Sequence, residues 1–465
     1  MRLKAVVGHF GFFTLAFGGM VGSAWIVLLG DWLRAAGPAG AALGIVGGAC
    51  VMVLVSLCYG ELAARFPSAG GEFLYTLRSF GPTAAFLMVW ILAMYATSIC
   101  AFEAIACAWL LTELLPHVGL AVAYEIGGER VTWMALGVGI CGTLTIGAIH
   151  YAGAQAAIRF QNLVTFGFLA ICLVLDLIAL TLGSSSNLRP LWVSFSYPSW
   201  IQGSLWIFST SAFFLNGWQT ALHALEERSP RVTPRGAVIS MSLAIVAAAI
   251  FYVMTIMATA SAEPWSAFVS ERVPAAASFR SLGMHGALAT ILIAAAIASL
   301  LKSWSGMCWL ASRLIFAAAR SGFLPSTFSR VDPRNGSPRA AVFIVTLFTV
   351  LGLSIGRVAI LPIVNMVTIC LALSLVVCLI ALLRQRHSSG AAQVFSVAGG
   401  NLTIGIACAG ALAMIVIALI IPLAQRGTAI PVEWILLAIW IALGLAVSRV
   451  MRRMRTGRHE ADLGL

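Results

Sequence analysis

Long apolar stretches separated by short polar connections follow one another from residue 8 to residue 449. A membrane-spanning helix needs about 20 apolar residues, and twelve stretches approach or exceed that length. They cover residues 8–29, 39–62, 83–111, 131–150, 159–182, 201–222, 237–260, 285–318, 339–355, 359–382, 400–421 and 431–449. The pattern predicts an all-α polytopic membrane protein with about 12 transmembrane helices, and the connections are too short to hold a separate soluble domain.

The composition agrees with this prediction and adds an orientation. Hydrophobic residues make up 61% of the 465 residues and charged residues only 9%, against roughly 25% charged in an ordinary soluble domain. With both termini on one side, twenty of the 28 lysines and arginines lie in connections on that side and seven on the other. Cytoplasmic loops carry such an excess, which predicts a cytoplasmic (inner) membrane protein with cytoplasmic N- and C-termini. The basic residues are scattered and form no basic face, so we expect no nucleic-acid partner.

Two of the apolar stretches are interrupted by polar or small residues. The first contains FGGMVGSAW (residues 17–25) and the sixth contains FFLNGWQ (residues 213–219). Glycine costs about 1 kcal/mol against alanine in a helix interior, and unwound backbone within a membrane is tolerated where it lines a cavity. The exposed N–H groups of a half-helix attract a carboxylate, and the freed carbonyls accept bonds from an ammonium. The interruptions therefore predict a site for an amino acid, or otherwise two kinked helices without a ligand.

Glycine has a second pattern in the second stretch. Gly40, Gly44 and Gly48 recur every four residues, which places them on one face of a helix. Small residues on one face allow another helix backbone to approach closely. We expect a tightly packed helix against this face.

Four segments in order carry a family resemblance. They are GGMVGSAWIVLLGDWLRAAGP (residues 18–38), YGELAARFPSAGGEFLYTLRSFGP (59–82), FFLNGWQTALHALEERSPRVTPRGAV (213–238) and ASRLIFAAARSGFLPSTFSRVDPRNGSPRAAV (311–342). In sequence and spacing they resemble the amino acid/polyamine/organocation (APC) superfamily of permeases. The resemblance implies a LeuT-like fold with two five-helix inverted repeats. These would be residues 1–183 and 200–383, followed by peripheral helices in residues 400–449 and a polar, frayed cytoplasmic tail in residues 450–465.

The resemblance also implies which groups contact the substrate. The N–H groups of Val21, Gly22, Ser23 and Ala24 would bind its carboxylate. Carbonyls of residues 17–19 and 213–215, among them those of Gly19, Phe213 and Phe214, would hold its amino group. Further side chains facing the site would be Tyr95, Ser98, Asn216, Trp218, Trp304 and Met307.

Several positions depart from the family pattern. Ala24 stands where glycine is usual, and Gln219 stands where many members carry an acid that would suit a second ammonium. A lysine that some members carry in the fifth span is replaced by Phe168. These departures favour a neutral substrate and remove one positive charge from the region where sodium-coupled relatives bind Na⁺.

Lys302, in the eighth apolar stretch, supplies a positive charge of its own. A charge in the middle of a membrane helix costs at least about 2.5 kcal/mol and is functional by default. Our hypothesis is that its ammonium occupies or abuts the cation site, with Ser303 beside it. The alternative is a lysine that snorkels or pairs structurally with a carboxylate. Glu103 and Asp176 are the candidates for that pairing, for proton relay or substrate contact, or for a structural role.

The remaining charged residues predict gates rather than chemistry. Glu226 and Glu227 match an acidic pair of the family and indicate a cytoplasmic gate or loop-fixing ion network, and Glu61 with Arg65 is similar in kind. The seven histidines form no HxxxH pattern and the ten cysteines no CxxC pair. We therefore expect no metal and no cofactor.

Together these features predict a secondary transporter and not an enzyme. It would move a small, neutral amino acid by alternating access, coupled to protons or by exchange. The alternative within the fold is a carrier of an amine, a polyamine or a cationic amino acid; a non-transporting sensor or a membrane enzyme is less favoured. The expected partners are the substrate and the lipid bilayer, and no oligomeric state is predicted.

Overall fold

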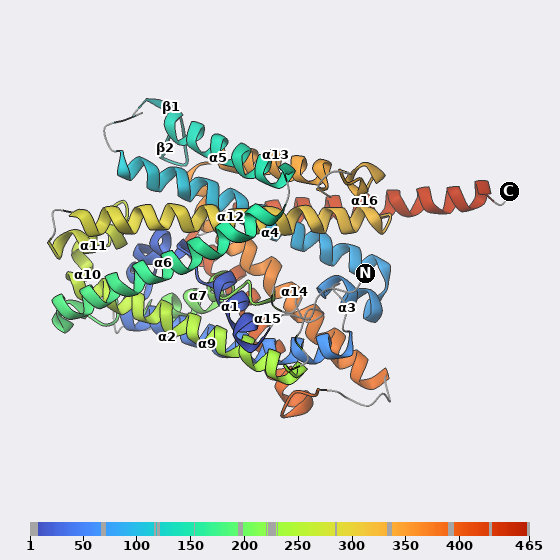
Figure 1. Ribbon diagram of the computed structural model, residues 1–465, viewed down its shortest axis with the longest axis horizontal. Helices are drawn as coiled ribbons and strands as arrows, with labels where there is room; N and C mark the ends of the chain where they lie inside the picture. Colours follow the sequence, from blue (N-terminus) through green and yellow to red (C-terminus); the bar gives the residue numbers. More distant parts are fainter. Residues whose placement is uncertain are drawn as a thin grey trace.

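The described part of the chain is a bundle of helices (Figure 1). The computed structural model describes all residues except 1–7, 67–70, 116–117, 119–120, 153, 194–198, 220, 222–228, 230, 284–285, 333–336, 389–394, 427–429 and 463–465. Side chains of residues 152, 154–163, 199, 234, 388, 424–426 and 451–462 are also outside the description.

The helices follow the apolar stretches closely. They are α1 (His9–Met20), α2 (Ala24–Arg65), α3 (Gly71–Phe80), α4 (Pro82–Leu114), α5 (Trp133–Ala152), α6 (Ala154–Leu182), α7 (Ser199–Phe214), α9 (Pro234–Ala262), α10 (Trp265–Phe268), α11 (Pro274–Ser281), α12 (Ala287–Arg320), α13 (Arg339–Leu353), α14 (Ile360–Ser388), α15 (Gly400–Arg426) and α16 (Val432–Asp462). Short 3-10 turns are η1 (Ser185–Leu188), η4 (Ser326–Ser329) and η5 (Arg357–Ala359).

Nine helices of the described residues are long and apolar enough to cross a membrane, compared with the twelve stretches in the sequence. The difference has a structural reason. The first stretch is divided between α1 and the start of α2, which continues into the second stretch. The sixth and ninth stretches form α7, with 16 residues, and α13, with 15 residues.

Helix α2 bends where the first and second stretches meet. Gly37 has φ 73° and ψ 172°, a conformation that an L side chain rarely adopts, and Pro38 follows it. The N–H of Ala39 donates to the carbonyl of Leu191 at 3.0 Å. The bend separates a first half-helix, residues 24–36, from the rest of α2.

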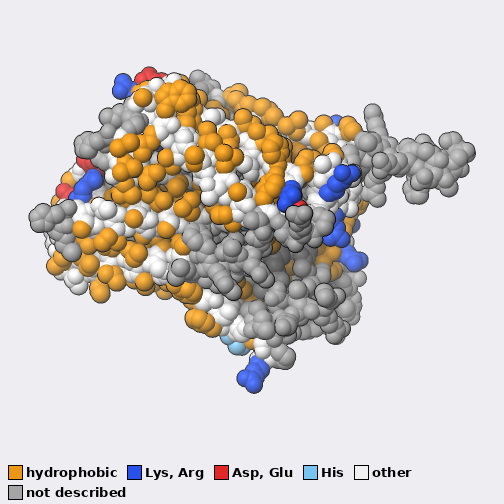
Figure 2. All heavy atoms as spheres, turned by 45° about the horizontal axis from the view of Figure 1, so that its top comes forward, with side chains coloured by type: hydrophobic (Ala, Val, Ile, Leu, Met, Phe, Trp, Pro, Cys, Tyr) orange, Lys and Arg blue, Asp and Glu red, His pale blue; other side chains and the backbone are white. Residues whose placement is uncertain are grey.

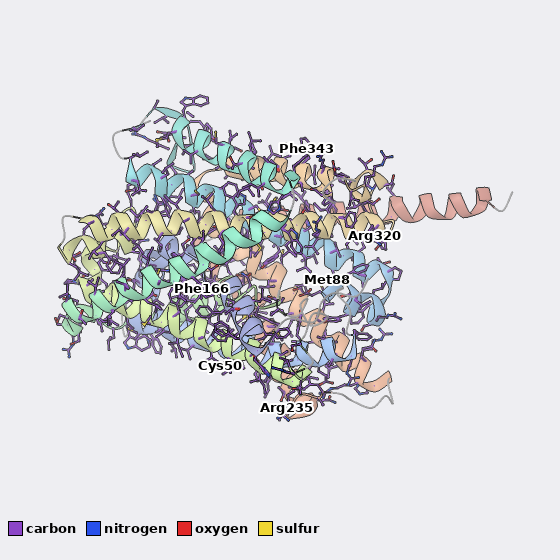
Figure 3. The ribbon with its side chains drawn as sticks, in the orientation of Figure 1. Cys50, Met88, Phe166, Arg235, Arg320 and Phe343 are labelled. Atoms are coloured by element: carbon purple, nitrogen blue, oxygen red, sulfur yellow. The ribbon has the colours of Figure 1, made fainter. Side chains whose placement is uncertain are left out.

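The arrangement of the bundle matches a membrane protein. α4 and α12 run side by side through its middle, and α2 packs against α7 and α9. α10 and α11 lie at one end, whereas α3 and the C-terminal ends of α2, α14 and α16 lie toward the other (Figure 1). Figure 2 shows an apolar surface between these ends, with charged side chains gathered toward them. Figure 3 shows Phe166 and Phe343 on outer helices and Arg320 at the end of α12.

The glycine face of α2 is confirmed, and its partner is α7. A Cβ built at Gly44 would lie 2.7 Å from the Ser204 carbonyl oxygen, and one built at Gly48 would overlap the Ser211 side chain. A Cβ at Gly40 would lie 2.9 Å from Ser204 Oγ. The two helices are therefore closer than any residue with a Cβ would allow.

Two connections differ from the prediction. The link between α4 and α5 contains a hairpin of β1 (Val122–Ile126) and β2 (Glu129–Thr132), joined at Gly127 and Gly128, which both have positive φ. Two glycines between short strands are a strong hairpin signal. The hairpin was not predicted because it is not a long apolar stretch.

The polar tail after residue 449 was expected to fray, but α16 continues through it to Asp462. Trp90 and Trp440 attach this helix to α4. Each indole N–H donates to the carbonyl of the other residue, at 2.8 and 2.9 Å, and the rings stack with centroids 4.5 Å apart.

The glycine face gives a first testable prediction. Gly44→Ala should lower the free energy of unfolding by about 1–3 kcal/mol, because its methyl group meets backbone that cannot move aside. Gly405→Ala on α15 is the matched control, since a Cβ there meets no atom within 4 Å. Thermal unfolding in detergent, followed by tryptophan fluorescence, measures both. An equal midpoint for the two variants would contradict the close packing.

Candidate functional site

Both predicted interruptions are present as breaks between helices. α1 ends at Met20 and α2 begins at Ala24, so residues 21–23 connect two half-helices. α7 ends at Phe214, and residues 215–218 leave the helix. Each break creates helix ends, whose backbone groups lack the partner that a continuous helix would provide.

The two breaks touch through their glycines. A Cβ built at Gly19 would lie 2.7 Å from the Gly217 carbonyl oxygen, and one built at Gly217 would lie 2.5 Å from the Gly19 oxygen. Gly217 also has φ +100°, which favours glycine. Backbone therefore lies on backbone at this crossing, without an intervening side chain.

The start of α2 offers backbone donors beside open space. Ser23 is the N-cap residue, but its hydroxyl does not cap the helix and donates instead to the carbonyl of Ala296 at 2.9 Å. A Cβ built at Gly22 would meet no atom within 4 Å. Of the residues predicted to bind a carboxylate, Gly22, Ser23 and Ala24 thus lie at a helix start with space beside it. The prediction was wrong for Val21, because its N–H donates to the carbonyl of Phe17 at 2.9 Å and ends α1.

Lys302 reaches the carbonyl side of the same break. Its Nζ donates to the carbonyls of Gly18 at 3.1 Å and Val21 at 3.2 Å, and the residue is only 3% exposed. The ion pairs seen among the described residues do not include it. The ammonium is held mainly by backbone oxygens that the broken helix frees.

Glu103 and Asp176 are buried at separate places. Glu103 of α4 accepts a hydrogen bond from Ser303 Oγ at 2.7 Å, so it contacts the residue next to Lys302. Asp176 of α6 accepts one from Thr255 Oγ1 of α9 at 2.8 Å. Of the two acids, Glu103 lies beside the lysine segment of α12.

One residue that the sequence pattern did not single out contacts the first break. Tyr252 of α9 donates its hydroxyl to the carbonyl of Met20 at 2.8 Å. Tyr252 is one of only seven tyrosines and lies within an otherwise apolar stretch, which is the signal that was available. A buried tyrosine hydroxyl usually finds a partner, but the sequence does not say which one.

Side chains of the second break satisfy its own backbone. Asn216 accepts from the Tyr95 hydroxyl at 2.6 Å through Oδ1, and its Nδ2 donates to the carbonyl of Phe213. Gln219 Oε1 accepts the N–H of Gly217 at 2.9 Å. Tyr95 and Asn216, both predicted site residues, are thus brought together.

The other predicted side chains have varied surroundings. Phe213 packs between Phe102 and Phe214, with ring centroids 5.1 and 5.0 Å apart. Trp218 is fully buried and meets Tyr59 edge-on. The Trp304 ring lies against Gly142 of α5. Ser98 is buried on α4, and Met307 is partly buried on α12.

A cavity of about 860 Å³ borders the first break from the side. It lies between α1, α6 and α9, and its lining is largely apolar, with Phe17, Gly18, Thr165, Phe166 and Met254 among its residues. Because the Gly18 carbonyl accepts a hydrogen bond from Lys302, this space reaches the backbone that the lysine holds.

Comparison with known proteins identifies the family. The chain matches the amino acid permease profile over residues 7–445. The chain belongs to the amino acid permease family. Membership in this family implies a LeuT-like fold and a transporter rather than an enzyme.

Individual relatives of this permease share between 23% and 28% of its residues over the aligned lengths. It is 27% identical over 357 residues to the Asc-type amino acid transporter 1 of Homo sapiens, which covers 74% of the chain and 64% of that transporter. It is 23% identical over 397 residues to the branched-chain amino acid permease BcaP of Bacillus subtilis, covering 83% and 82%. It is 28% identical over 336 residues to the chloroplastic cationic amino acid transporter 9 of Arabidopsis thaliana, covering 70% and 57%. The permease thus spans less than two thirds of the length of the first and the third.

An ion network closes the end of the permease at which α2 stops. Glu61 is fully buried and accepts bonds from Arg65 at 2.8 Å, from Arg386 Nε of α14 at 2.8 Å and from the N–H of Val397 at 2.9 Å. The Glu61–Arg65 pair was predicted, whereas Arg386 was not assigned to it. The predicted gate residues Glu226 and Glu227 lie outside the described residues.

This network generates a second prediction. Glu61→Gln should destabilise the permease by about 3–5 kcal/mol, because two guanidinium groups lose their buried counter-charge. Glu125→Gln removes the exposed pair with Arg130 and should change stability by at most about 1 kcal/mol. Thermal unfolding midpoints in detergent measure the difference. Similar midpoints for the two variants would show that the buried network does not hold this end together.

Proposed function

We propose that this permease carries a small amino acid with an uncharged side chain across the cytoplasmic membrane by alternating access. The single observation that supports this most strongly is the contact between the two helix breaks. It brings an uncapped helix start with open space beside it close to freed carbonyls. An amino acid has the complementary pair of groups, a carboxylate and an ammonium.

The proposal includes the full family architecture. Ten of twelve spans would form two five-helix inverted repeats in residues 1–183 and 200–383. The other two would be peripheral helices in residues 400–449, followed by a cytoplasmic segment in residues 450–465. Both termini would face the cytoplasm, which the distribution of lysine and arginine supports.

The binding groups follow from the two breaks. The N–H groups of residues 22–24 would bind the carboxylate, since Ser23 leaves the start of α2 without a side-chain cap and the N–H of Val21 is already bonded to the carbonyl of Phe17. Carbonyls of Gly19, Phe213 and Phe214 would bind the amino group. The side chains of Tyr95, Ser98, Asn216, Trp218, Trp304 and Met307 would bound the rest of the site.

An uncharged side chain is favoured by Gln219 and by one relative. Gln219 replaces the acid of many family members, and its amide oxygen accepts the N–H of Gly217. Of the three relatives compared above, the one aligned over the largest share of both chains is named for branched-chain amino acids. A carrier of amines, polyamines or cationic amino acids is the alternative, in which Glu103 or Asp176 would bind a second ammonium; another relative is named for cationic amino acids.

Energy coupling is assigned to Lys302. Its ammonium, bonded to two carbonyls of the first break, would stand in for a bound cation, and a proton or exchanged amino acid would drive transport. Ser303 connects this segment to Glu103, and these two residues with Asp176 complete the coupling candidates. Glu226 and Glu227 would belong to the cytoplasmic gate.

Uptake into proteoliposomes tests the substrate class. Labelled alanine or leucine should accumulate in the lumen, and an excess of unlabelled neutral amino acids should block this uptake. Inhibition by putrescine or arginine alone would support the alternative. If no amino acid produces flux or thermal stabilisation, that result would indicate a non-transporting sensor instead.

Lys302→Met tests the coupling role with a side chain of similar length and no charge. We expect uptake to fall at least about tenfold, equivalent to 1.4 kcal/mol, and its dependence on pH to flatten. Stabilisation of the purified variant by alanine serves as the control for folding. Wild-type uptake with an unchanged pH profile would disprove the role.

A further inference from the structure

Asn216 lies in the second break, and both polar atoms of its side chain have a hydrogen-bond partner. The side chain is 6% exposed, and its two partners, the Tyr95 hydroxyl and the Phe213 carbonyl, belong to residues that are also buried. The orientation of the amide follows from chemistry, because a carbonyl oxygen only accepts hydrogen bonds. The atom facing Phe213 must therefore be the donor Nδ2, which leaves Oδ1 for the tyrosine.

The Phe213 carbonyl is the important partner. The proposed function assigns the carbonyls of this break to the amino group of the substrate. One of them is already occupied by an N–H donor from the protein itself. A backbone carbonyl oxygen has two lone pairs, so the Asn216 amide occupies one of its acceptor positions, and a substrate ammonium that approaches from that side would compete with the amide.

We propose that Asn216 sets the substrate affinity of the site by acting as an internal competitor for the substrate amino group. In the empty site its Nδ2 takes the place of that group at Phe213, and it withdraws when an ammonium arrives. The inference rests on the proposed function, because it needs a ligand whose amino group approaches this break.

The charge of the substrate amino group makes displacement favourable. A hydrogen bond from an ammonium is roughly twice as strong as one between neutral groups, so an ammonium can displace the amide. A hydroxyl group has no such advantage over the amide. Every ligand that donates to Phe213 must displace the amide at the same cost, whereas a carboxylate without such a donor avoids that cost.

The competition also lowers the affinity for the preferred ligand. When a binding-competent state is only partly populated, the apparent dissociation constant is the intrinsic constant divided by the populated fraction. Removing the amide should thus tighten binding of any ligand that donates to Phe213. A carboxylate without such a donor should be unaffected.

Asn216→Ala tests the proposal with three ligands that differ in one group. Dissociation constants of alanine, lactate and propionate are measured by calorimetry on the detergent-purified protein. We expect those of alanine and lactate to fall by about threefold or more, as the competent fraction rises, with that of propionate unchanged. Weaker alanine binding would show that Asn216 is a direct contact, and unchanged binding that it does not compete; either result overturns the proposal.

Two further variants separate competition from damage to the break. Tyr95→Phe removes the hydroxyl that holds Oδ1 and leaves the bond to Phe213, so alanine binding should tighten by less than in Asn216→Ala. Ser209→Ala on α7 is the matched control, since it removes only a hydroxyl bonded to the Trp206 carbonyl. If Asn216→Ala does not fold, Tyr95→Phe alone decides, and no gain in alanine affinity refutes the proposal. If the wild-type protein binds no amino acid, the proposed function itself fails.

Discussion

The backbone contact between Gly19 and Gly217 sets the conditions for everything around it. Two interrupted helices meet where neither has room for a Cβ, so their freed carbonyls are close together and cannot be shielded by intervening side chains. In a membrane these oxygens need donors, because lipid supplies none. The polar residues at the centre of this apolar protein are arranged around that requirement.

The donors come from several parts of the bundle. Lys302 of α12 donates to the carbonyls of Gly18 and Val21. Tyr252 of α9 donates to that of Met20, and Asn216 donates to that of Phe213 within its own break. Only one of these donors is charged, and its charge is spread over two carbonyl oxygens. This arrangement explains how a buried lysine is accommodated without a carboxylate at ion-pair distance among the described residues.

The sequence predicted most of the fold, because each feature has a local signal. Apolar length located the helices, glycine content located both breaks, and glycine spacing located the face of α2 that packs on α7. The rarity of charge within apolar stretches identified Lys302. The partners of Tyr252 and Asn216 were not predictable, since they depend on how distant helices pack. The hairpin and the continuation of α16 were missed because neither is a long apolar stretch.

The self-satisfied backbone of the second break has a thermodynamic consequence. Bare carbonyls in an unloaded cavity would require ordered water, and each immobilised water molecule can cost up to about 2 kcal/mol of entropy. Here the Phe213 oxygen has a covalently attached donor, whose ordering was already part of folding. The Phe213 oxygen is therefore satisfied without an immobilised water molecule, and its hydrogen bond does not carry that entropic cost.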